Sequence, residues 1–467
     1  MGGPGAGNSA VGDGVTETER AEERMRALQA LEVCLALFLG VVYNVCALAY
    51  VLPAQRGVEV ASLGALLRLL GSLHMDVGTF YFLLKGYVAG EFIRRGAAAD
   101  ARGEAGDASL AAARSEQAEI EAQCSTLVDP VLAQRAYVKG ILRAVLPHLV
   151  LSGALHLVLQ GFTCTSCAWD WANILLSPCL LSGFADVRDG NVFRGASEIS
   201  WLVQDQTLML IFAFEAYDHL LRQAENLRLV TGGVLLGWLS VFLQVYAGLT
   251  QPRYANLITR NVFTNFLFFS SGMLLCILQQ RQSFREAAAP YLATLSGLGV
   301  GAWAVLAVLV SALYLHHLDG RPGVDAASDC VSSFGGAPCL WAFDVCAGRL
   351  LPLQLLALAW LTDCGCLFPP HLGGELAEPL TRTFRSLNAS VAAYREYALV
   401  WLLYGELLGF GIHSLLSFLL PGLVVHFLYV VLVLEVALIA VLCVYLKQVS
   451  ADWLDARFAR VAAALAL

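Results

Sequence analysis

The sequence predicts an all-α membrane protein: a polytopic bundle of about ten transmembrane helices with both termini in the cytoplasm. Composition is the first observation behind this fold class. Hydrophobic residues make up 58% of the 467-residue chain and charged residues only 14%, whereas a soluble domain of this size needs a far more charged surface. The second observation is that the apolar residues form blocks of about 18 to 25, which cross roughly 30 Å of hydrocarbon as helix.

The predicted spans follow one another along the chain. We place them at 31–52, 70–93, 141–162, 200–221, 229–249, 262–280, 291–316, 350–368, 397–419 and 424–446. The apolar stretch 171–184 is too short to cross a bilayer and contains Pro178, which predicts a re-entrant or interfacial segment. An eleventh span at that place is the main alternative.

Loop charges predict the orientation of the bundle. With ten spans, most of the 29 Lys and Arg residues, including Arg94, Arg95 and Arg281, lie on the side that holds both termini. Positive charge gathers on the cytoplasmic side of membrane proteins, so both termini are expected in the cytoplasm. An odd number of spans would spoil this separation, which favours ten.

The parts outside the spans are small. Residues 1–29, rich in Gly, Ala and acidic side chains, predict a disordered N-terminal tail. Residues 30–449 form the transmembrane bundle, and 450–467 a short amphipathic C-terminal tail. Within the bundle, loop 96–134 is expected on the cytoplasmic side and loop 317–349 on the opposite side.

The sequence lacks the motifs of several common catalytic and binding sites. There is no Gly-x-Ser-x-Gly elbow, no P-loop and no HExxH motif. Cys164 and Cys167 form one CxxC among 13 cysteines, but no second pair or His cluster follows at zinc-finger spacing, so no metal is expected. The net charge of −8, without a basic groove, argues against nucleic acid as a partner.

Ionisable residues inside the spans are the candidate functional residues, because each is costly in hydrocarbon and usually faces a bundle interior or a wet cavity. They are His74, Asp76 and Lys85 in the second span, His148 and His156 in the third, Asp205 and Glu215 in the fourth, Asp363 in the eighth, Glu406 and His413 in the ninth, and His426 and Glu435 in the tenth. Gln206 adds a further polar side chain beside Asp205. This density indicates a polar internal site or path.

A structural interpretation competes with the functional one for several of these residues. His426, near a span end, is more often interfacial than catalytic. Lys85 either reaches the cytoplasmic interface or neutralises a carboxylate on a neighbouring helix. Asp76 is a poor partner for it, because their nine-residue separation puts the two on opposite faces of a helix.

The order of these features resembles the membrane-bound acyltransferase type 3 family. Residues 79–87, TFYFLLKGY, resemble its Asp-x-Phe-Phe-x-Leu-Ser-Gly-Phe signature, and 137–147, YVKGILRAVLP, resemble its basic entry ending in Arg and Pro. Residues 200–206, SWLVQDQ, are similar to its Trp-Ser/Thr-Leu segment before a Glu. Residues 259–273 resemble the segment that leads into a Phe-Leu-x-Gly span. The resemblance covers 30–450 in outline.

The resemblance implies a multi-pass integral membrane O-acyltransferase that moves an acyl group from acyl-CoA to a hydroxyl acceptor. Acyl-CoA would be a co-substrate with no bound cofactor, and the expected partners are the lipid bilayer, acyl-CoA and a small-molecule or lipid acceptor. The implied catalytic residues are His74, His148, His156 and Asp205. The implied substrate-binding residues are Asp76, Lys85, Lys139, Arg143, Trp201 and Gln206, with Lys139 and Arg143 flanking a cytoplasmic entry for the CoA phosphates.

The chain departs from the family pattern where the family carries its general base. The family's first-span Arg and the His that follows it correspond here to Glu32 and Tyr43. Acyl transfer to a hydroxyl needs a base that works near neutral pH, and imidazole suits that best. Another histidine (His148, His156 or His74) has therefore taken the role, or catalysis has been lost.

Two further functions follow from the same residues. A proton-coupled transporter would use Asp76, Asp205, Glu406 and His413 as a path, and would be expected to show inverted repeats, which we do not detect. A catalytically inactive acyltransferase-like scaffold is the third hypothesis. It gains weight if no histidine lies near a carboxylate or a ligand-sized cavity.

Overall fold

The computed structural model describes residues 17–46, 49, 77–95, 130–163, 180, 200–236, 239, 262–292, 355, 357–359, 362, 377–420 and 427–464. Across these residues every regular element is helical and no strand occurs, so the predicted all-α class is confirmed for this part of the chain. The labelled elements are α1 (Glu17–Leu37), η1 (Phe38–Val42), α5 (Pro130–Thr163), α7 (Ser200–Ile211), α8 (Ala213–Gln223), α11 (Val262–Leu278), α16 (Ala377–Ala392), η3 (Arg395–Tyr397), α17 (Ala398–Leu419) and α19 (Leu428–Ala464). Residues 77–95 form a further helix without a label.

Four helices in the described part of the chain are long and apolar enough to cross a membrane. They are Glu22–Cys46, Gln134–Leu155, Arg395–Leu419 and Leu428–Gln448, and they overlap the first, third, ninth and tenth predicted spans. Asn265–Leu278 is a shorter apolar helix within the sixth. The predicted span 291–316, the segment 171–184 and loop 317–349 lie almost entirely outside the described residues.

The first helix begins earlier than its apolar block. α1 starts at Glu17, inside the segment 1–29 for which the sequence predicts a disordered tail. From Glu17 to Gln29 most residues are Glu, Arg or Ala, and these are strong helix formers. Glu22 and Arg26, one turn apart, form an ion pair at 3.5 Å. At the other end of the chain, α19 continues without a break through the predicted tail as far as Ala464.

The helix that begins as α1 contains a one-turn π segment, η1, where it meets α17. The widened turn frees backbone carbonyl oxygens, and the Asn44 side chain donates to those of Leu39 and Gly40 at 3.2 and 3.0 Å. A Cβ added to Gly40 would lie 2.4 Å from the Trp401 carbonyl oxygen. Glycine is therefore required at this crossing of α17.

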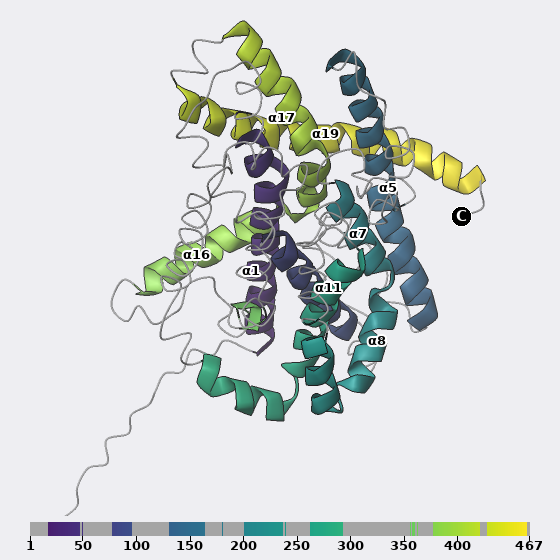
Figure 1. Ribbon diagram of the computed structural model, residues 1–467, viewed down its shortest axis with the longest axis vertical. Helices are drawn as coiled ribbons and strands as arrows, with labels where there is room; N and C mark the ends of the chain where they lie inside the picture. The colour runs from purple at the N-terminus through teal and green to yellow at the C-terminus, as the bar shows by residue number, and fades with distance from the viewer. Residues whose placement is uncertain are drawn as a thin grey trace, which may run out of the picture.

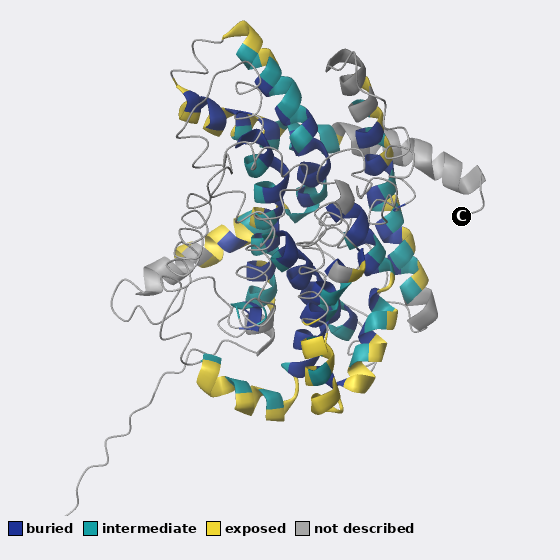
Figure 2. Ribbon diagram, in the orientation of Figure 1, coloured by how far each residue is buried: buried dark blue, intermediate teal, exposed yellow. Residues whose placement is uncertain are grey.

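The bundle is built around α1, which runs through the middle of Figure 1 with α5 along one side and α16 on the other. α1 packs on α16, while α17 packs on η1, α5 and α19. Buried residues gather along α1, α7, α11 and α17, whereas the outer surfaces of α8 and of the helix over 282–292 are exposed (Figure 2).

The helix over 77–95 and α11 approach each other backbone to backbone. A Cβ at Gly86 would lie 1.8 Å from the Phe269 carbonyl oxygen, and one at Gly272 would lie 1.9 Å from the Leu83 carbonyl oxygen. Small residues at such crossings allow the close van der Waals packing typical of helices in membranes. This contact holds α11 against the helix that supplies Lys85.

α19 shows the two-sided pattern of a helix at the outside of a bundle. Its buried residues recur every three or four positions and include Leu432, Glu435 and Ile439, which defines one inward face. The remaining surface carries exposed large apolar side chains: Tyr429, Val430, Val433, Leu434, Leu438, Val441 and Tyr445. An exposed apolar face of this kind suits contact with lipid tails.

Candidate functional site

A cavity of about 90 Å³ lies where α1, the helix over 77–95, α5, α7, α17 and α19 come together. The acidic and basic side chains in its lining are Glu32, Lys85, His148, Arg395, Glu396 and Lys447. The apolar lining comes mainly from α5 and α17. Charged side chains from four separate parts of the chain therefore converge on one internal space.

Glu32 is the centre of this charge cluster. Its side chain is buried in α1, where it accepts a hydrogen bond from Lys85 Nζ, and Arg395 Nε lies 3.4 Å from its Oε2. Lys85 is also buried, with its ammonium group 5.4 Å from the centre of the Tyr81 ring. Of the two interpretations of Lys85, neutralisation of a carboxylate on a neighbouring helix is confirmed, and that carboxylate is Glu32.

A second ion pair closes the cavity on the α19 side. Lys447 Nζ lies 3.3 Å from Glu396 Oε2 and 3.2 Å from the Glu396 carbonyl oxygen. The same ammonium group lies 5.3 Å from the centre of the Tyr397 ring. Arg395 and Glu396 both come from η3, the short 3₁₀ turn before α17. This turn therefore presents one cation and one anion to the same space.

His148 lines the cavity from α5, directly after Pro147, which cannot donate a backbone hydrogen bond inside the helix. Its Nδ1 lies 3.2 Å from the Tyr404 hydroxyl oxygen, and that hydroxyl donates to the His148 carbonyl oxygen at 3.3 Å. The hydroxyl has one proton for these two acceptors, so its direction sets the tautomer of His148. When it donates to the carbonyl oxygen, Nδ1–H donates to the hydroxyl oxygen and Nε2 carries the lone pair, which is the form that a general base requires.

Gln206 and Asp205 are neighbours in α7 but lie in different surroundings. Gln206 lines the cavity, where its Oε1 accepts a hydrogen bond from the Tyr81 hydroxyl at 2.9 Å. Asp205 is fully buried and accepts from Asn265 Nδ2 at 2.9 Å, and its Oδ1 has no hydrogen-bond partner among the described residues. Adjacent helix positions differ by about 100° in direction, which separates Asp205 from the cavity.

The other candidates from the sequence do not meet in this cavity within the described structure. Lys139 and Arg143 are exposed on α5 and are not part of the cavity lining. His74 and Asp76 lie outside the described residues, as do the side chains of His156 and Trp201, whose backbones belong to α5 and α7.

The sequence arguments missed three charges that line the cavity. Arg395, Glu396 and Lys447 lie at the ends of the ninth and tenth predicted spans, where charged residues are ordinary and attract no attention. The available signal was the matching of opposite charges at the facing ends of two consecutive predicted spans. Tyr404, which orients His148, carries no such signal.

A second buried polar pair lies between α17 and α19. His413 Nδ1 is 3.0 and 3.1 Å from the two carboxylate oxygens of Glu435, and both side chains are 1% exposed or less. His413 Nε2 has no hydrogen-bond partner among the residues that the structure describes. Neither side chain is part of the cavity lining.

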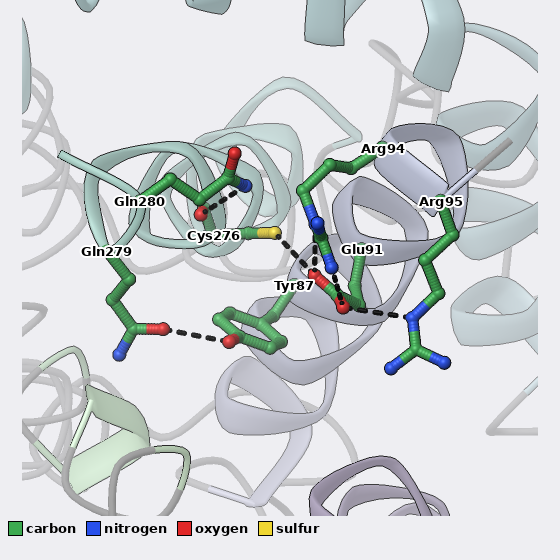
Figure 3. Close-up of polar contacts among 7 residues, drawn as sticks. All are labelled: Tyr87, Glu91, Arg94, Arg95, Cys276, Gln279 and Gln280. Carbon is green, nitrogen blue, oxygen red and sulfur yellow. Dashed lines mark hydrogen bonds and ion pairs between the residues drawn. The ribbon is translucent and has the colours of Figure 1, made fainter. Parts of the chain in front are cut away.

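A third cluster ties the end of the helix over 77–95 to α11 (Figure 3). Glu91 accepts hydrogen bonds from Arg94 Nε at 2.8 Å and Arg95 Nε at 2.9 Å, and from Cys276 Sγ at 3.6 Å. The hydrogen bond that Arg94 donates to the Glu91 carboxylate raises the pKa of Arg94 above its usual value. The contact from Cys276 to Glu91 joins the two helices, which gives the cluster the role of a structural anchor.

Comparison with family models, with characterised proteins and with solved structures gives no match to this chain. Among the described residues, no group of three or more His, Cys, Asp and Glu side chains could hold a metal ion. Functional assignment therefore depends on the geometry of the cavity and on the sequence motifs around it.

Proposed function

We propose that this chain is a multi-pass integral membrane protein, with about ten spans and cytoplasmic termini, that transfers an acyl group from acyl-CoA to a hydroxyl acceptor. The observation that carries the proposal is His148, which lines a charged cavity with its Nδ1 side held by Tyr404. The similarity of 79–87 and 200–206 to motifs of the membrane-bound acyltransferase type 3 family supports the same function.

In this proposal His148 acts as the general base. Its Nε2 takes the proton of the acceptor hydroxyl as the oxygen attacks the thioester carbonyl carbon. The carbon–sulfur bond then breaks, an ester forms, and the departing CoA thiolate receives the proton back from the imidazolium. Lys85 and Arg395, which line the same cavity, would stabilise the negative charge that develops on the carbonyl oxygen.

The departures from the family pattern fit this assignment. The family's first-span Arg and second-span Ser correspond to Glu32 and Lys85, and these two residues form an ion pair with each other. Each change is thus compensated electrostatically by the other. The family's base position corresponds to Tyr43, and His148 supplies the imidazole from the third predicted span instead.

Release of CoA by the purified full-length chain tests the proposal. Protein in phosphatidylcholine nanodiscs would be given acetyl-CoA or palmitoyl-CoA, with a total lipid extract and glycerol as hydroxyl acceptors, and the free thiol measured. We expect His148→Gln to lower the rate by at least about 100-fold while thioester binding is retained, because only proton transfer is lost.

His219→Gln is the matched control, because His219 is an exposed histidine on α8. It should leave the rate of CoA release unchanged. Failure of the wild-type chain to bind either thioester would contradict the proposal. Equal rates in wild type and His148→Gln would contradict the assignment of the base.

A second function, proton-coupled transport, is favoured by the His413–Glu435 pair. Buried ionisable pairs between membrane helices are typical of proton relays, and His413 has its Nε2 available within the described surroundings. Proton uptake into proteoliposomes that Glu435→Gln abolishes, together with no CoA release by the wild-type chain, would select transport over acyl transfer.

A further inference from the structure

We infer that Asp205 is a proton-binding site. In the native protein it carries a proton and joins α7 to α11 as a neutral carboxylic acid, so this helix contact weakens when alkaline pH removes the proton. The inference rests on the burial of the side chain, on its hydrogen-bond partner and on the charged groups of the neighbouring helices. It does not depend on acyl transfer.

The Asp205 side chain is shielded from water. Its exposed fraction is 0%, and its neighbours Gln204 and Thr207 on α7 are buried as well. Across the contact with α11, Asn265 is 1% exposed. Transfer of an ionised carboxylate into such surroundings is strongly unfavourable unless a cation or several hydrogen bonds replace its hydration, and an isolated carboxyl group takes up a proton instead.

The hydrogen bonds of Asp205 do not replace that hydration. Asn265 Nδ2 donates to Oδ2 at 2.9 Å, whereas Oδ1 is buried without a hydrogen-bond partner in the described structure. Buried carboxylates that stay ionised accept two or three hydrogen bonds, and the donor here is a neutral amide. With a proton on Oδ1, the carbonyl Oδ2 still accepts from Asn265. An unpaired neutral hydroxyl costs far less than an unpaired charge.

The helices around Asp205 bring it no compensating charge. α7 packs on α5, α8, α11 and α17, and Gln206 joins it to the helix over 77–95. The acidic and basic side chains that these helices bury fully or in part are Lys85, Glu91, Arg94, Arg95, His148, Glu406 and His413. Their other buried titratable groups are tyrosines and Cys276. Within the described structure, none of these groups forms an ion pair or a hydrogen bond with Asp205.

Loss of the proton would reach the cavity through α7. Gln206 follows Asp205 directly, lines the cavity and accepts a hydrogen bond from the Tyr81 hydroxyl. α11 is held against the helix over 77–95 by the close approach at Gly272. When an ionised Asp205 draws in water or a counter-ion, α7 is therefore the helix that shifts. The proton on Asp205 keeps this wall of the cavity in place.

The pH dependence of stability gives the first test. An unfolded aspartate releases its proton near about pH 4, so above that pH the folded chain holds a proton that the unfolded chain has lost. Wild-type stability then falls as pH rises, and the unfolding equilibrium constant increases by up to about tenfold per pH unit. Asp205→Asn has no proton to lose. We expect this variant to gain stability relative to wild type between about pH 5 and about pH 8, measured by reversible unfolding in mixed micelles.

Asp218→Asn is the matched control. Asp218 lies on α8 and forms an exposed ion pair with Arg222, so it is ionised in the folded chain and in the unfolded chain across this pH range. The difference in stability between Asp218→Asn and wild type should therefore stay constant with pH.

Infrared spectroscopy of the full-length chain tests the proton directly. A protonated carboxyl group has a C=O stretching band at higher frequency than a carboxylate, and deuterium exchange shifts it. The difference spectrum between wild type and Asp205→Asn at neutral pH should contain this band, whereas that between wild type and Asp218→Asn should not. Isotopic labelling of the aspartate carboxyl carbons identifies the band in the wild-type chain without any substitution.

Each result either supports or overturns the inference. An aspartic acid band that Asp205→Asn removes, together with a relative gain in stability as pH rises, supports it. Absence of the band from the labelled wild-type chain overturns it, as does a stability difference that does not change with pH. Wild-type stability that depends on sodium rather than on pH would identify a bound cation and would also overturn it. None of these readouts requires CoA release.

Discussion

Glu32 is a carboxylate with 1% of its surface exposed, and two cations contact it. Burial of a single charge in this way would be strongly unfavourable, but Lys85 and Arg395 offset the loss of hydration. The pairing also explains why a lysine can occupy the middle of an apolar helix. Removal of Glu32 leaves Lys85 and Arg395 in a low-dielectric space without the carboxylate that they share.

Glu32→Gln is expected to lower the free energy of unfolding by about 3–5 kcal/mol, because Lys85 and Arg395 lose their shared carboxylate. Reversible unfolding in mixed micelles measures the change. Glu22→Gln is the control, since Glu22 forms an exposed ion pair with Arg26 whose loss should cost less than about 1 kcal/mol. Similar losses in the two variants would show that Glu32 is not the centre of the cluster.

The sequence places Asp205 among the candidate catalytic residues. In the structure it accepts a hydrogen bond from Asn265 and does not line the cavity, so we expect it to support the fold rather than the reaction. Asp205→Asn keeps the shape of the side chain and a carbonyl oxygen for Asn265, so CoA release should stay within about threefold of wild type, as expected for a group outside the reacting space. The measurement is the thiol assay used for His148. A fall in the rate of CoA release comparable to that of His148→Gln would show that Asp205 takes part in the reaction.

The contact between α11 and the helix over 77–95 depends on glycine. Gly272 brings its Cα against the Leu83 carbonyl oxygen, with no room for a methyl group. Because backbone rather than a flexible side chain fills this space, the two helices must separate if a Cβ is added. The helix that carries Tyr81 and Lys85 would move with them.

Gly272→Ala should therefore destabilise the protein by at least about 2 kcal/mol through overpacking. Gly233→Ala is the matched control, because a Cβ at Gly233, which is also helical, meets no atom within 4 Å. That change should stabilise the protein by up to about 1 kcal/mol through helix propensity. Thermal unfolding of both variants in the same nanodiscs compares them, and a loss at Gly233 equal to that at Gly272 would contradict the close-approach argument.

In the part of the molecule that the structure describes, several charged side chains are buried between apolar helices. α19 exposes large apolar side chains over one face and buries Glu435 on the other, the reverse of a soluble helix. This distribution agrees with the four helices that are long and apolar enough to cross a membrane. The charged cavity lies between the helices of the bundle.

Membrane topology can be tested with glycosylation acceptors inserted into the predicted loops. With ten spans and cytoplasmic termini, an acceptor in loop 317–349 should be glycosylated in microsomes, whereas acceptors in loop 96–134 and in the tail 1–29 should not. Mass shifts on gels, reversed by an endoglycosidase, provide the measurement. Glycosylation in loop 96–134 or in the tail 1–29 would exclude this orientation.

Sequence patterns identified the helices and part of the site for clear physical reasons. Long apolar blocks predict membrane helices because hydrocarbon thickness sets their length, and α17 and α19 overlap the spans predicted for them. Polar side chains inside apolar spans must be buried or solvated internally, which singles out Lys85, His148 and Gln206, all of which line the cavity. Charged residues at span ends are common and need no internal partner, so sequence patterns did not single out Arg395, Glu396 and Lys447.

The sequence by itself determined the all-helical class, the apolar character of the helices and the presence of ionisable groups within them. Only the tertiary structure decided which of those groups meet. Glu32 and Lys85 are 53 positions apart, and His148 and Tyr404 are 256 apart, so no local pattern encodes either contact. Packing brings them together, because a buried charge or hydroxyl must find its partner on a neighbouring helix when neither water nor lipid can supply one.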